Sequence, residues 1–311
     1  MIVKRMLSFV IPCYRSEHTI ENVINEIIET VSFRSEWDYE IICVNDCSPD
    51  GVYSVLEKLA LNNKKIKVVN LARNFGQHNA LMAGYRQVKG EIVVCLDDDG
   101  QTKPEDCFKL IDALDENSDI VYAKYPRKKE SLFRLFGSWT ARRMSQWLCS
   151  IPKNIELNSY FACKRFVIDE MIRYDNPYPY LAGLQVRATR RLKNVDIPHH
   201  EREFGKSGYS FHKLVSLWLN GFTAFSVKPL RLATLIGGLV SSAGFLYMIF
   251  IIIKKIQHPD MAMGYSSMMC VMLFIGGMLM LMLGLIGEYI GRIYICLNKS
   301  PQYVIRNTVN C

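Results

Sequence analysis

Two long apolar runs without a charged residue constrain what this chain can fold into. One covers residues 232–253 and the other covers residues 268–287. Each has about the 20 residues that a helix needs to cross a hydrocarbon core roughly 30 Å thick. The alternative is a buried helical hairpin, but soluble cores rarely need two uncharged runs of this length. The sequence therefore predicts a two-helix transmembrane hairpin over residues 227–290.

The basic residues around these runs predict how the chain is oriented in a membrane. Near the outer ends of the runs lie Lys228, Arg231, Arg292, Lys299 and Arg306, and between the runs lie Lys254 and Lys255. Because cytoplasmic loops are enriched in lysine and arginine, we expect both termini in the cytoplasm, with residues 291–311 as a short tail. The formal net charge is +8, and much of it lies near apolar segments. We therefore expect membrane lipids and phosphorylated ligands as partners, and no nucleic acid.

Strand and helix signals alternate over the first 125 residues. Short apolar, β-branched runs occur at 7–11, 39–44, 66–71, 91–96 and 119–123, and amphipathic stretches lie between or after them at 19–31, 52–62, 77–88 and 104–114. This alternation predicts an α/β domain with a mostly parallel, doubly wound sheet. The ten cysteines are scattered without a metal-binding spacing, which indicates reduced, mostly structural thiols.

Two later stretches combine bulky aromatic residues with cations at close to helical spacing. They lie near residues 131–150 and 210–226. Such stretches suit helices that lie in a membrane interface, and core helices of the α/β domain are the alternative. We expect interfacial helices, which would belong to a globular domain over residues 1–226.

Polar residues follow each of the first four predicted strands. They are Pro12, Tyr14 and Glu17 after the first strand, Asp46 after the second, Arg73 after the third, and Asp97, Asp98, Asp99 and Gln101 after the fourth. Ligands of a parallel sheet bind beyond the carboxyl ends of its strands. Consecutive strands thus direct polar groups to one rim, as a nucleotide site requires. Arg73 is either a surface charge or, at the start of a helix, a residue that faces a phosphate.

Asp97, Asp98 and Asp99 form an acidic triplet at the end of an apolar run. Carboxylates packed this closely repel one another unless a cation bridges them. Mg²⁺ or Mn²⁺ prefers such oxygen ligands and shares them with substrate phosphates. A solvated turn or a helix cap before Pro104 is the alternative for the triplet, and a turn is the alternative for Asp46. Two acidic sites on one rim favour ligand binding.

The order of these motifs resembles a known family. The segments that carry the resemblance are VIPCYRSE at 10–17, VNDCS at 44–48, ARNFG at 72–76 and LDDDGQTKPE at 96–105. Together they are similar to the inverting family 2 glycosyltransferases of GT-A fold. Within that family the chain resembles the polyprenyl-phosphate sugar transferases, the group of dolichol-phosphate mannose synthase and the bacterial O-antigen glucosylation enzymes. REFGKSGY at 202–209 and GEYIGRIY at 287–294 resemble the bacterial members.

The resemblance implies a role for each matching residue. The nucleotide would be held by Pro12, Tyr14, Glu17, Asp46 and Asp98. The metal, Mg²⁺ or Mn²⁺, and the diphosphate would be held by Asp97, Asp99 and Gln101. The acceptor phosphate would be contacted by Arg202 and Ser207. The residues expected to take part in catalysis are Asp97, Asp99 and Arg202.

One segment departs from the family pattern. The family commonly has Gly-Asp-Phe-Arg where this chain reads NSYF at 158–161. Ser159 therefore replaces the aspartate often taken as the catalytic base, and Phe161 replaces an arginine. Arg165 is expected to help hold the acceptor phosphate instead, with Lys164 and Arg142 as alternatives.

A phosphate acceptor needs no such base. A phosphate monoester has a second pKa near ~6 and is largely dianionic at neutral pH. The reaction needs in-line placement, cations that screen two approaching anions, and stabilisation of the departing nucleotide diphosphate, which a metal on Asp99 would supply. We therefore expect a base-free displacement that inverts the anomeric carbon.

Residues and resemblance together predict a multi-pass glycosyltransferase of the cytoplasmic membrane. It would move one sugar from a nucleotide-sugar, with UDP favoured by the resemblance, to a polyprenyl phosphate such as undecaprenyl phosphate, for cell-envelope glycans. One alternative is a processive polysaccharide synthase. Such enzymes usually carry a Gln-x-x-Arg-Trp motif, and the segment QVRATR at 185–190 of this chain lacks the tryptophan. The other is a non-catalytic subunit that binds or flips a lipid carrier, for which Ser159 is the best support. A homo-oligomer is compatible with the sequence.

Overall fold

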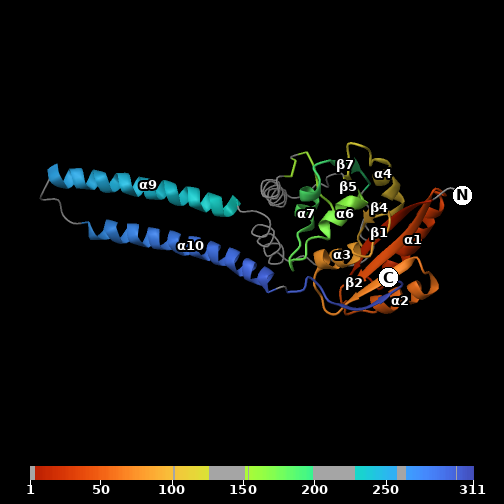
Figure 1. Ribbon diagram of the computed structural model, residues 1–311. Helices are drawn as coiled ribbons and strands as arrows, with labels where there is room; N and C mark the ends of the chain where they lie inside the picture. Colours follow the sequence, from red (N-terminus) through yellow and green to blue (C-terminus); the bar gives the residue numbers. More distant parts are fainter. Residues whose placement is uncertain are drawn as a thin grey trace. The chain divides into compact units, whose positions relative to one another are not determined.

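The computed structural model describes residues 4–100, 102–125, 151–152, 154–198, 228–257, 264–298 and 300–311. The chain divides into two compact units (Figure 1). The first consists of Met1–Ser216 together with Lys299–Cys311, and the second is Leu217–Asn298. The helices predicted near 131–150 and 210–226 lie outside the described residues.

The first unit is built on a sheet that has eight strands in the described part of the chain, in the order β7-β5-β6-β4-β1-β2-β3-β8. The strands are β1 (Arg5–Cys13), β2 (Trp37–Asn45), β3 (Ile66–Leu71), β4 (Ile92–Cys95), β5 (Ile120–Lys124), β6 (Phe161–Lys164), β7 (Leu192–Asp196) and β8 (Ile305–Val309). All five predicted strands are present, and the order β4-β1-β2-β3 places a topological switch point between β1 and β4, where α/β sheets bind ligands.

Most neighbouring strands run parallel, as predicted. β1 pairs parallel with β2 and β4, β2 pairs parallel with β3, and β5 pairs parallel with β7. β6 runs antiparallel to both β4 and β5, and β8 runs antiparallel to β3. The carboxyl ends of the six other strands therefore share one edge of the sheet, which we call the rim.

Helices cover both faces of the sheet. They are α1 (Ile20–Ser32), α2 (Val52–Asn62), α3 (Gln77–Tyr85), α4 (Cys107–Asp112), α6 (Arg165–Met171) and α7 (Leu181–Ala188), with a 3₁₀ turn at Pro104–Asp106 before α4. The buried face of α1 packs into one core cluster with alternate residues of β1 such as Phe9. α3 covers the opposite face, where a Cβ on Gly84 would lie 2.7 Å from Cγ1 of Val10. Each buried branched side chain contributes about 1.5–3 kcal/mol to stability.

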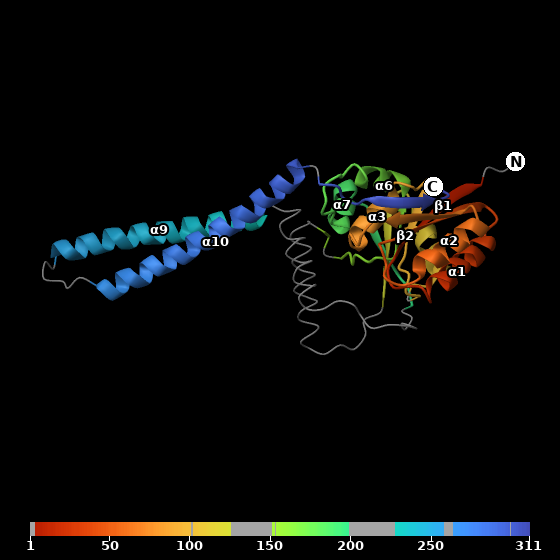
Figure 2. The same ribbon diagram turned by 90° about the horizontal axis from the view of Figure 1, so that it is seen from below.

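The C-terminal residues are part of this sheet. The sequence predicts a tail over 291–311, but α10 (Tyr265–Leu297) continues past residue 291 and residues 305–309 form β8. Figure 2 shows this strand, in blue, beside the red and orange N-terminal strands. The strand is only five residues long, and the sequence signal of an isolated edge strand is weak because its pairing partner is distant.

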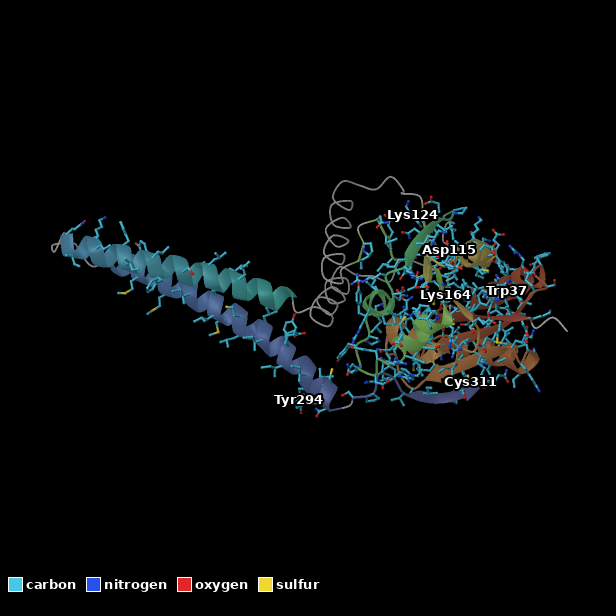
Figure 3. All side chains as sticks on the ribbon, turned by 45° about the horizontal axis from the view of Figure 1, so that its top comes forward. Trp37, Asp115, Lys124, Lys164, Tyr294 and Cys311 are labelled. Atoms are coloured by element: carbon cyan, nitrogen blue, oxygen red, sulfur yellow. The ribbon has the colours of Figure 1, made fainter. Side chains whose placement is uncertain are left out.

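The second unit contains two long helices, α9 (Lys228–Gln257) and α10, which lie side by side (Figures 1 and 2). A Cβ on Gly237 would lie 3.3 Å from the end of the Met282 side chain, so this side chain packs against α9 at the glycine. Among the described residues, one segment, Phe274–Leu297, is long and apolar enough to cross a membrane by length and composition. Figure 3 shows the described side chains of α10 projecting outward, with Tyr294 near its end. The two predicted uncharged runs thus fall in α9 and α10.

Candidate active site

Each loop that follows β1, β2, β3 or β4 contains a residue with a left-handed backbone. These residues are Arg15 (φ 60°), Cys47 (φ 50°), Gly76 (φ 87°) and Gly100 (φ 73°). Glycine adopts this conformation freely, but for Arg15 and Cys47 it is uncommon and costs about 1–3 kcal/mol. Such strain persists only where the surroundings fix it, and it concentrates at binding sites. The loops at the rim, which the sequence also predicts to bind a ligand, are therefore the candidate site.

The loops after β1 and β2 are bonded to each other. The amide of Arg15 donates to Ser48 Oγ (2.8 Å), and the amide of Glu17 donates to Asp50 Oδ2 (3.1 Å). The Glu17 carboxylate accepts from the amide of Gly51 (2.9 Å), the residue that caps the N-terminus of α2. A Cβ at Gly51 would lie 2.6 Å from Glu17 Oε1. Glu17 thus stabilises the start of α2, and its contact with a nucleotide stays a prediction.

Asp46 holds the loop after β3. Its Oδ1 and Oδ2 accept hydrogen bonds from the amides of Phe75 (2.7 Å) and Gly76 (2.8 Å), just before α3. The residue is 3% exposed. Burial raises the pKa of this carboxyl, and the two amide hydrogen bonds oppose that rise. The start of α3 is therefore occupied by a carboxylate of the protein itself, and Arg73 lies exposed beside it with its guanidinium over the Phe75 ring.

Asp98 connects the loop after β4 to the loop after β1 across the switch point. Its Oδ2 accepts from the amide of Tyr14 (2.9 Å), and its carbonyl accepts from Thr19 Oγ1 (2.6 Å). Burial raises the pKa of the Asp98 carboxyl to about 6. Pro12 is buried near the end of β1, whereas Tyr14 is 44% exposed. Tyr14 is the predicted nucleotide residue whose side chain the structure presents most openly for stacking.

Asp97 faces the segment that departs from the family pattern. In the antiparallel register of β4 and β6, Cys95 lies opposite Phe161, so two residues further on Asp97 lies opposite Ser159. Ser159 Oγ donates to Asp97 Oδ2 (2.5 Å), and Gln77 Nε2 donates to Asp97 Oδ1 (2.9 Å). Both bonds favour the ionised carboxylate and fix its orientation. The local sequence offers Ser159 no base, but the fold places a carboxylate beside it.

Asp97 and Asp99 are partly exposed on the loop after β4, on either side of Asp98. Among the described residues, no three His, Cys, Asp or Glu side chains lie close enough to hold a metal ion by themselves. Mg²⁺ is commonly held by one or two carboxylates together with ligand phosphates and waters. Asp97 and Asp99 fit that mode of binding. Gln101, the third predicted metal ligand, lies outside the described residues.

A cavity of about 360 Å³ opens beyond the end of β5. Its lining includes Tyr125, Ile155, Glu156, Asn158 and Tyr180. Burial, together with the charges of Asp97 and nearby acidic residues, raises the pKa of the Tyr125 phenol. Asn158 Nδ2 donates to the carbonyl of Ala123 (3.1 Å), which fixes the cavity wall next to Ser159. The cavity therefore adjoins the Asp97 end of the rim.

The structure does not bring Arg165 to this rim. Arg165 follows β6, which runs against the strands that end there, so Lys164 pairs with Ile92 at the start of β4. Arg165 lies about 20 Å along the chain from Ser159, at the opposite edge of the sheet, and forms an ion pair with Asp169 (2.8 Å). Figure 3 shows Lys164 near Asp115, which precedes β5. Arg165 therefore lies apart from the other predicted site residues, and its contact with an acceptor phosphate stays a prediction.

Three more residues predicted for the acceptor phosphate lie outside the described part of the chain, and three residues at the rim were not predicted. Arg202 and Ser207 lie outside the described residues, as does Arg142. Gln77, Asn158 and Tyr125 were not singled out by sequence. Gln77 directly follows the ARNFG segment and is the first residue of α3. This position after a predicted strand is the sequence feature that could have identified it.

A mostly parallel α/β sheet, with carboxylates fit for a cation and a cavity at its carboxyl edge, is an arrangement typical of nucleotide-binding proteins. The chain belongs to the family 2 glycosyl transferases, since residues 8–171 match the family described as Glycosyl transferase family 2. Residues 228–293 match the family described as GtrB C-terminal hairpin. The protein is therefore a glycosyltransferase, as predicted.

Curated relatives are similar over almost the whole chain. An uncharacterized glycosyltransferase of Bacillus subtilis, YkcC, is 32% identical over 97% of this chain and 93% of its own length. The undecaprenyl-phosphate 4-deoxy-4-formamido-L-arabinose transferase of Proteus mirabilis is 31% identical over 97% of this chain and 94% of its own length. The enzyme of the same name from Yersinia enterocolitica is 32% identical over 98% and 94%. These names support the predicted polyprenyl-phosphate group.

Solved structures share the fold at low sequence identity. Glucosyl-3-phosphoglycerate synthase from Mycobacterium tuberculosis, solved with Mn²⁺, UDP-glucose and phosphoglyceric acid, has a TM-score of 0.53 and 18% identity over 71% of this chain and 79% of that one. Mannosyl-3-phosphoglycerate synthase from Rubrobacter xylanophilus has a TM-score of 0.55 and 17% identity over 70% and 71%. Both likenesses support a GT-A sheet in this chain.

Proposed function

We propose that this glycosyltransferase moves one sugar from a nucleotide-sugar, with UDP the favoured nucleotide, to undecaprenyl phosphate at the cytoplasmic face of the membrane. The observation that carries the proposal is the match of nearly the whole chain to undecaprenyl-phosphate sugar transferases. The rim described above, with Asp97 and Asp99 beside a cavity, supplies a place for the reaction.

The donor would lie along the rim, across the switch point. Tyr14 offers an exposed ring for a base, and Asp97 and Asp99 would hold a divalent cation shared with the diphosphate. When bound, that cation stabilises the negative charge of the departing nucleotide diphosphate. The cavity lined by Tyr125 and Asn158 adjoins Asp97, and we assign it to the sugar or to the incoming phosphate.

The acceptor phosphate would attack without a protein base. It is largely dianionic at neutral pH, because its second pKa is near ~6. Ser159 donates its hydroxyl proton to Asp97, and we assign it the role of holding that carboxylate in place, without a proton transfer to or from the acceptor. Arg202 and Ser207 remain the proposed contacts of the acceptor phosphate, and a homo-oligomer remains compatible with the proposal.

The position of β8 supports a membrane hairpin with two crossings. β8 follows α10 in the chain but pairs with β3 in the transferase sheet. The chain must therefore return to the side of the membrane on which it began. If α10 crosses a bilayer, a second crossing must precede it, and α9 is the long helix described in that part of the chain. We propose that both helices span, with the transferase domain and the C-terminus in the cytoplasm.

The test is a product analysis in isolated membranes. Membranes that contain the full chain are incubated with undecaprenyl phosphate and single UDP-, GDP- or dTDP-sugars, and the lipid is analysed by mass spectrometry. We expect one donor to add the mass of one sugar, and we expect EDTA or Asp97→Asn to abolish that product. A lipid-linked polymer would favour a processive synthase. Absence of a lipid product with every donor would favour the non-catalytic alternative.

A further inference from the structure

The C-terminal strand β8 contacts the end of β3 that belongs to the rim. The amide of Ala72 donates to the carbonyl of Val304 (2.8 Å), and the Arg306 guanidinium donates to the carbonyl of Ala72 (3.1 Å). Ala72 directly precedes Arg73 in the loop after β3. The chain therefore returns from the helical unit to the carboxyl edge of the sheet, next to loops that shape the candidate site.

A row of carboxamides leads from the exposed Asn307 on β8 to two buried ones in the sheet. Asn70 Nδ2 donates to Asn307 Oδ1 (2.8 Å), and Asn45 Nδ2 donates to Asn70 Oδ1 (2.9 Å). The amide of Ser48 then donates to Asn45 Oδ1 (3.1 Å). Asn45 is 3% exposed and Asn70 is 7% exposed. The hydrogen bonds all point the same way, an arrangement in which each bond polarises the next.

The row ends in the loop that the candidate site depends on. Ser48 Oγ accepts a hydrogen bond from the amide of Arg15. Ser48 follows Cys47, whose backbone is left-handed, and precedes Asp50. Asp46 lies between Asn45 and Cys47 in the chain. Side-chain bonds thus connect β8, β3, β2 and the loop after β1 in sequence.

Covering the edge of a sheet does not require this row. Backbone pairing and apolar side chains would cover β3, whereas a buried carboxamide such as that of Asn70 destabilises the fold if it loses its partner. Fully satisfied polar networks instead specify one arrangement of the groups that they connect. The row ends at Ser48, so the segment that it positions is the loop over residues 46–51.

We propose that Asn307 is a positioning residue of the nucleotide-binding rim, acting through Asn70 and Asn45 on the loop over residues 46–51. The C-terminal strand is then part of the donor site as well as the edge of the sheet. The inference rests on the proposed function for the identity of the nucleotide. It does not rest on that function for the shape of the loop.

The test uses the full chain in detergent and two measurements. Hydrogen–deuterium exchange without ligand reports the loop over 46–51, and calorimetric titration with UDP and MnCl₂ reports nucleotide binding. Asn307→Ala should speed exchange in the loop and raise the Kd for UDP about fivefold, as loss of one hydrogen bond of ~1 kcal/mol predicts. Turnover at saturating donor should change less than twofold. Asn307→Asp keeps an oxygen for Asn70 and should lie between wild type and Asn307→Ala.

Asn310→Gly, directly after the same strand, is the matched control. Asn310 Nδ2 donates to the carbonyls of Ala60 (2.7 Å) and Ile66 (2.9 Å), away from the rim, and its φ of 60° suits glycine. This variant should lower the Tm while leaving loop exchange and the Kd for UDP unchanged. Equal effects of the two substitutions on loop exchange, or no effect of Asn307→Ala, would overturn the proposal. Failure of the wild type to bind UDP would count against the proposed donor, and the exchange comparison would still decide the role of Asn307.

Discussion

On one side of the rim, Glu17 and Asp46 point back into the protein, where their oxygens accept hydrogen bonds from backbone amides. On the other side, Asp97 accepts from the side chains of Gln77 and Ser159 at the edge of a cavity. A carboxylate bound to backbone amides fixes a loop, and removing it leaves those amides without partners. A carboxylate at the edge of a cavity lies where a cation and a ligand phosphate can reach it. Acidic residues that look equivalent along one rim can therefore have different uses.

The largest expected effect is on turnover at the cation side. Asp99→Ala and Asp97→Ala should each lower transfer by about 10³-fold or more, because the charge of the leaving diphosphate loses its counterion site. Each variant should keep the Tm within a few degrees of wild type. Full activity of the wild type in EDTA, with no added divalent ion, would contradict the assignment.

A large stability effect is expected at Asp46. Asp46→Ala leaves the partly buried amides of Phe75 and Gly76 without this partner, so the free energy of unfolding should fall by about 2–4 kcal/mol. Denaturant unfolding of the detergent-solubilised chain measures the change. Asp50→Ala, at a more exposed carboxylate on the same loop, is the comparison and should cost less. Equal stability of the Asp46 variant and wild type would mean that the loop is not held by this residue.

Asp98 should make stability depend on pH. Its folded pKa is raised to about 6, above the ordinary value of ~3.9, so the folded state disfavours the charged form. The contribution of Asp98 to stability is therefore greatest below about pH 4, falls as the pH rises to about 6, and is constant above that. Asp98→Asn should stabilise the metal-free chain by about 1–3 kcal/mol at pH 8 and by little at pH 4. Thermal unfolding in EDTA at the two pH values checks this, and an equal gain at both would contradict it.

The smallest effect is expected at Ser159. Ser159→Ala removes one hydrogen bond to Asp97 and should cost about 0.5–1.5 kcal/mol, or roughly tenfold in turnover at most. Ser159→Thr keeps the hydroxyl and is the control. Arg202→Ala should cost more, because acceptor charge would stay unscreened. A thousandfold loss for Ser159→Ala with Arg202→Ala nearly silent would overturn the base-free mechanism.

The alternating part of the fold could be predicted because its signals are local. The predicted range 66–71 coincides with β3, and the predicted helix 52–62 coincides with α2. β6 and β8 are four and five residues long, and nothing near them in the sequence shows which strand they join or in which direction. The direction of β6 decides that Ser159 lies at the rim and Arg165 at the opposite edge. The motif alone therefore does not show at which edge of the sheet Arg165 lies.

The sequence predicts which residues lie at the candidate site. It does not predict which atoms those residues contact. Parallel strands bring their carboxyl ends together, so Asp46 and the acidic triplet were expected on one rim. Whether a carboxylate turns toward an amide or toward the cavity depends on loop conformations that tertiary contacts fix, such as the left-handed Arg15 and Cys47. The bond between Ser159 and Asp97 joins residues far apart in sequence, and it became visible only through the register of β4 and β6.

The division of the rim can be tested by one paired measurement on Asp46→Asn and Asp97→Asn, since each replaces a carboxylate with an amide of the same shape. For both variants the Tm and the Mn²⁺-dependent binding of UDP are measured on the same detergent-solubilised sample. We expect Asp46→Asn to lower the Tm and to bind UDP within about threefold of wild type once folded, because its amide nitrogen faces a backbone N–H. We expect Asp97→Asn to keep the Tm and lose the Mn²⁺-dependent part of binding. The opposite pattern, with a stable Asp46→Asn that no longer binds and an unstable Asp97→Asn that does, would contradict the account.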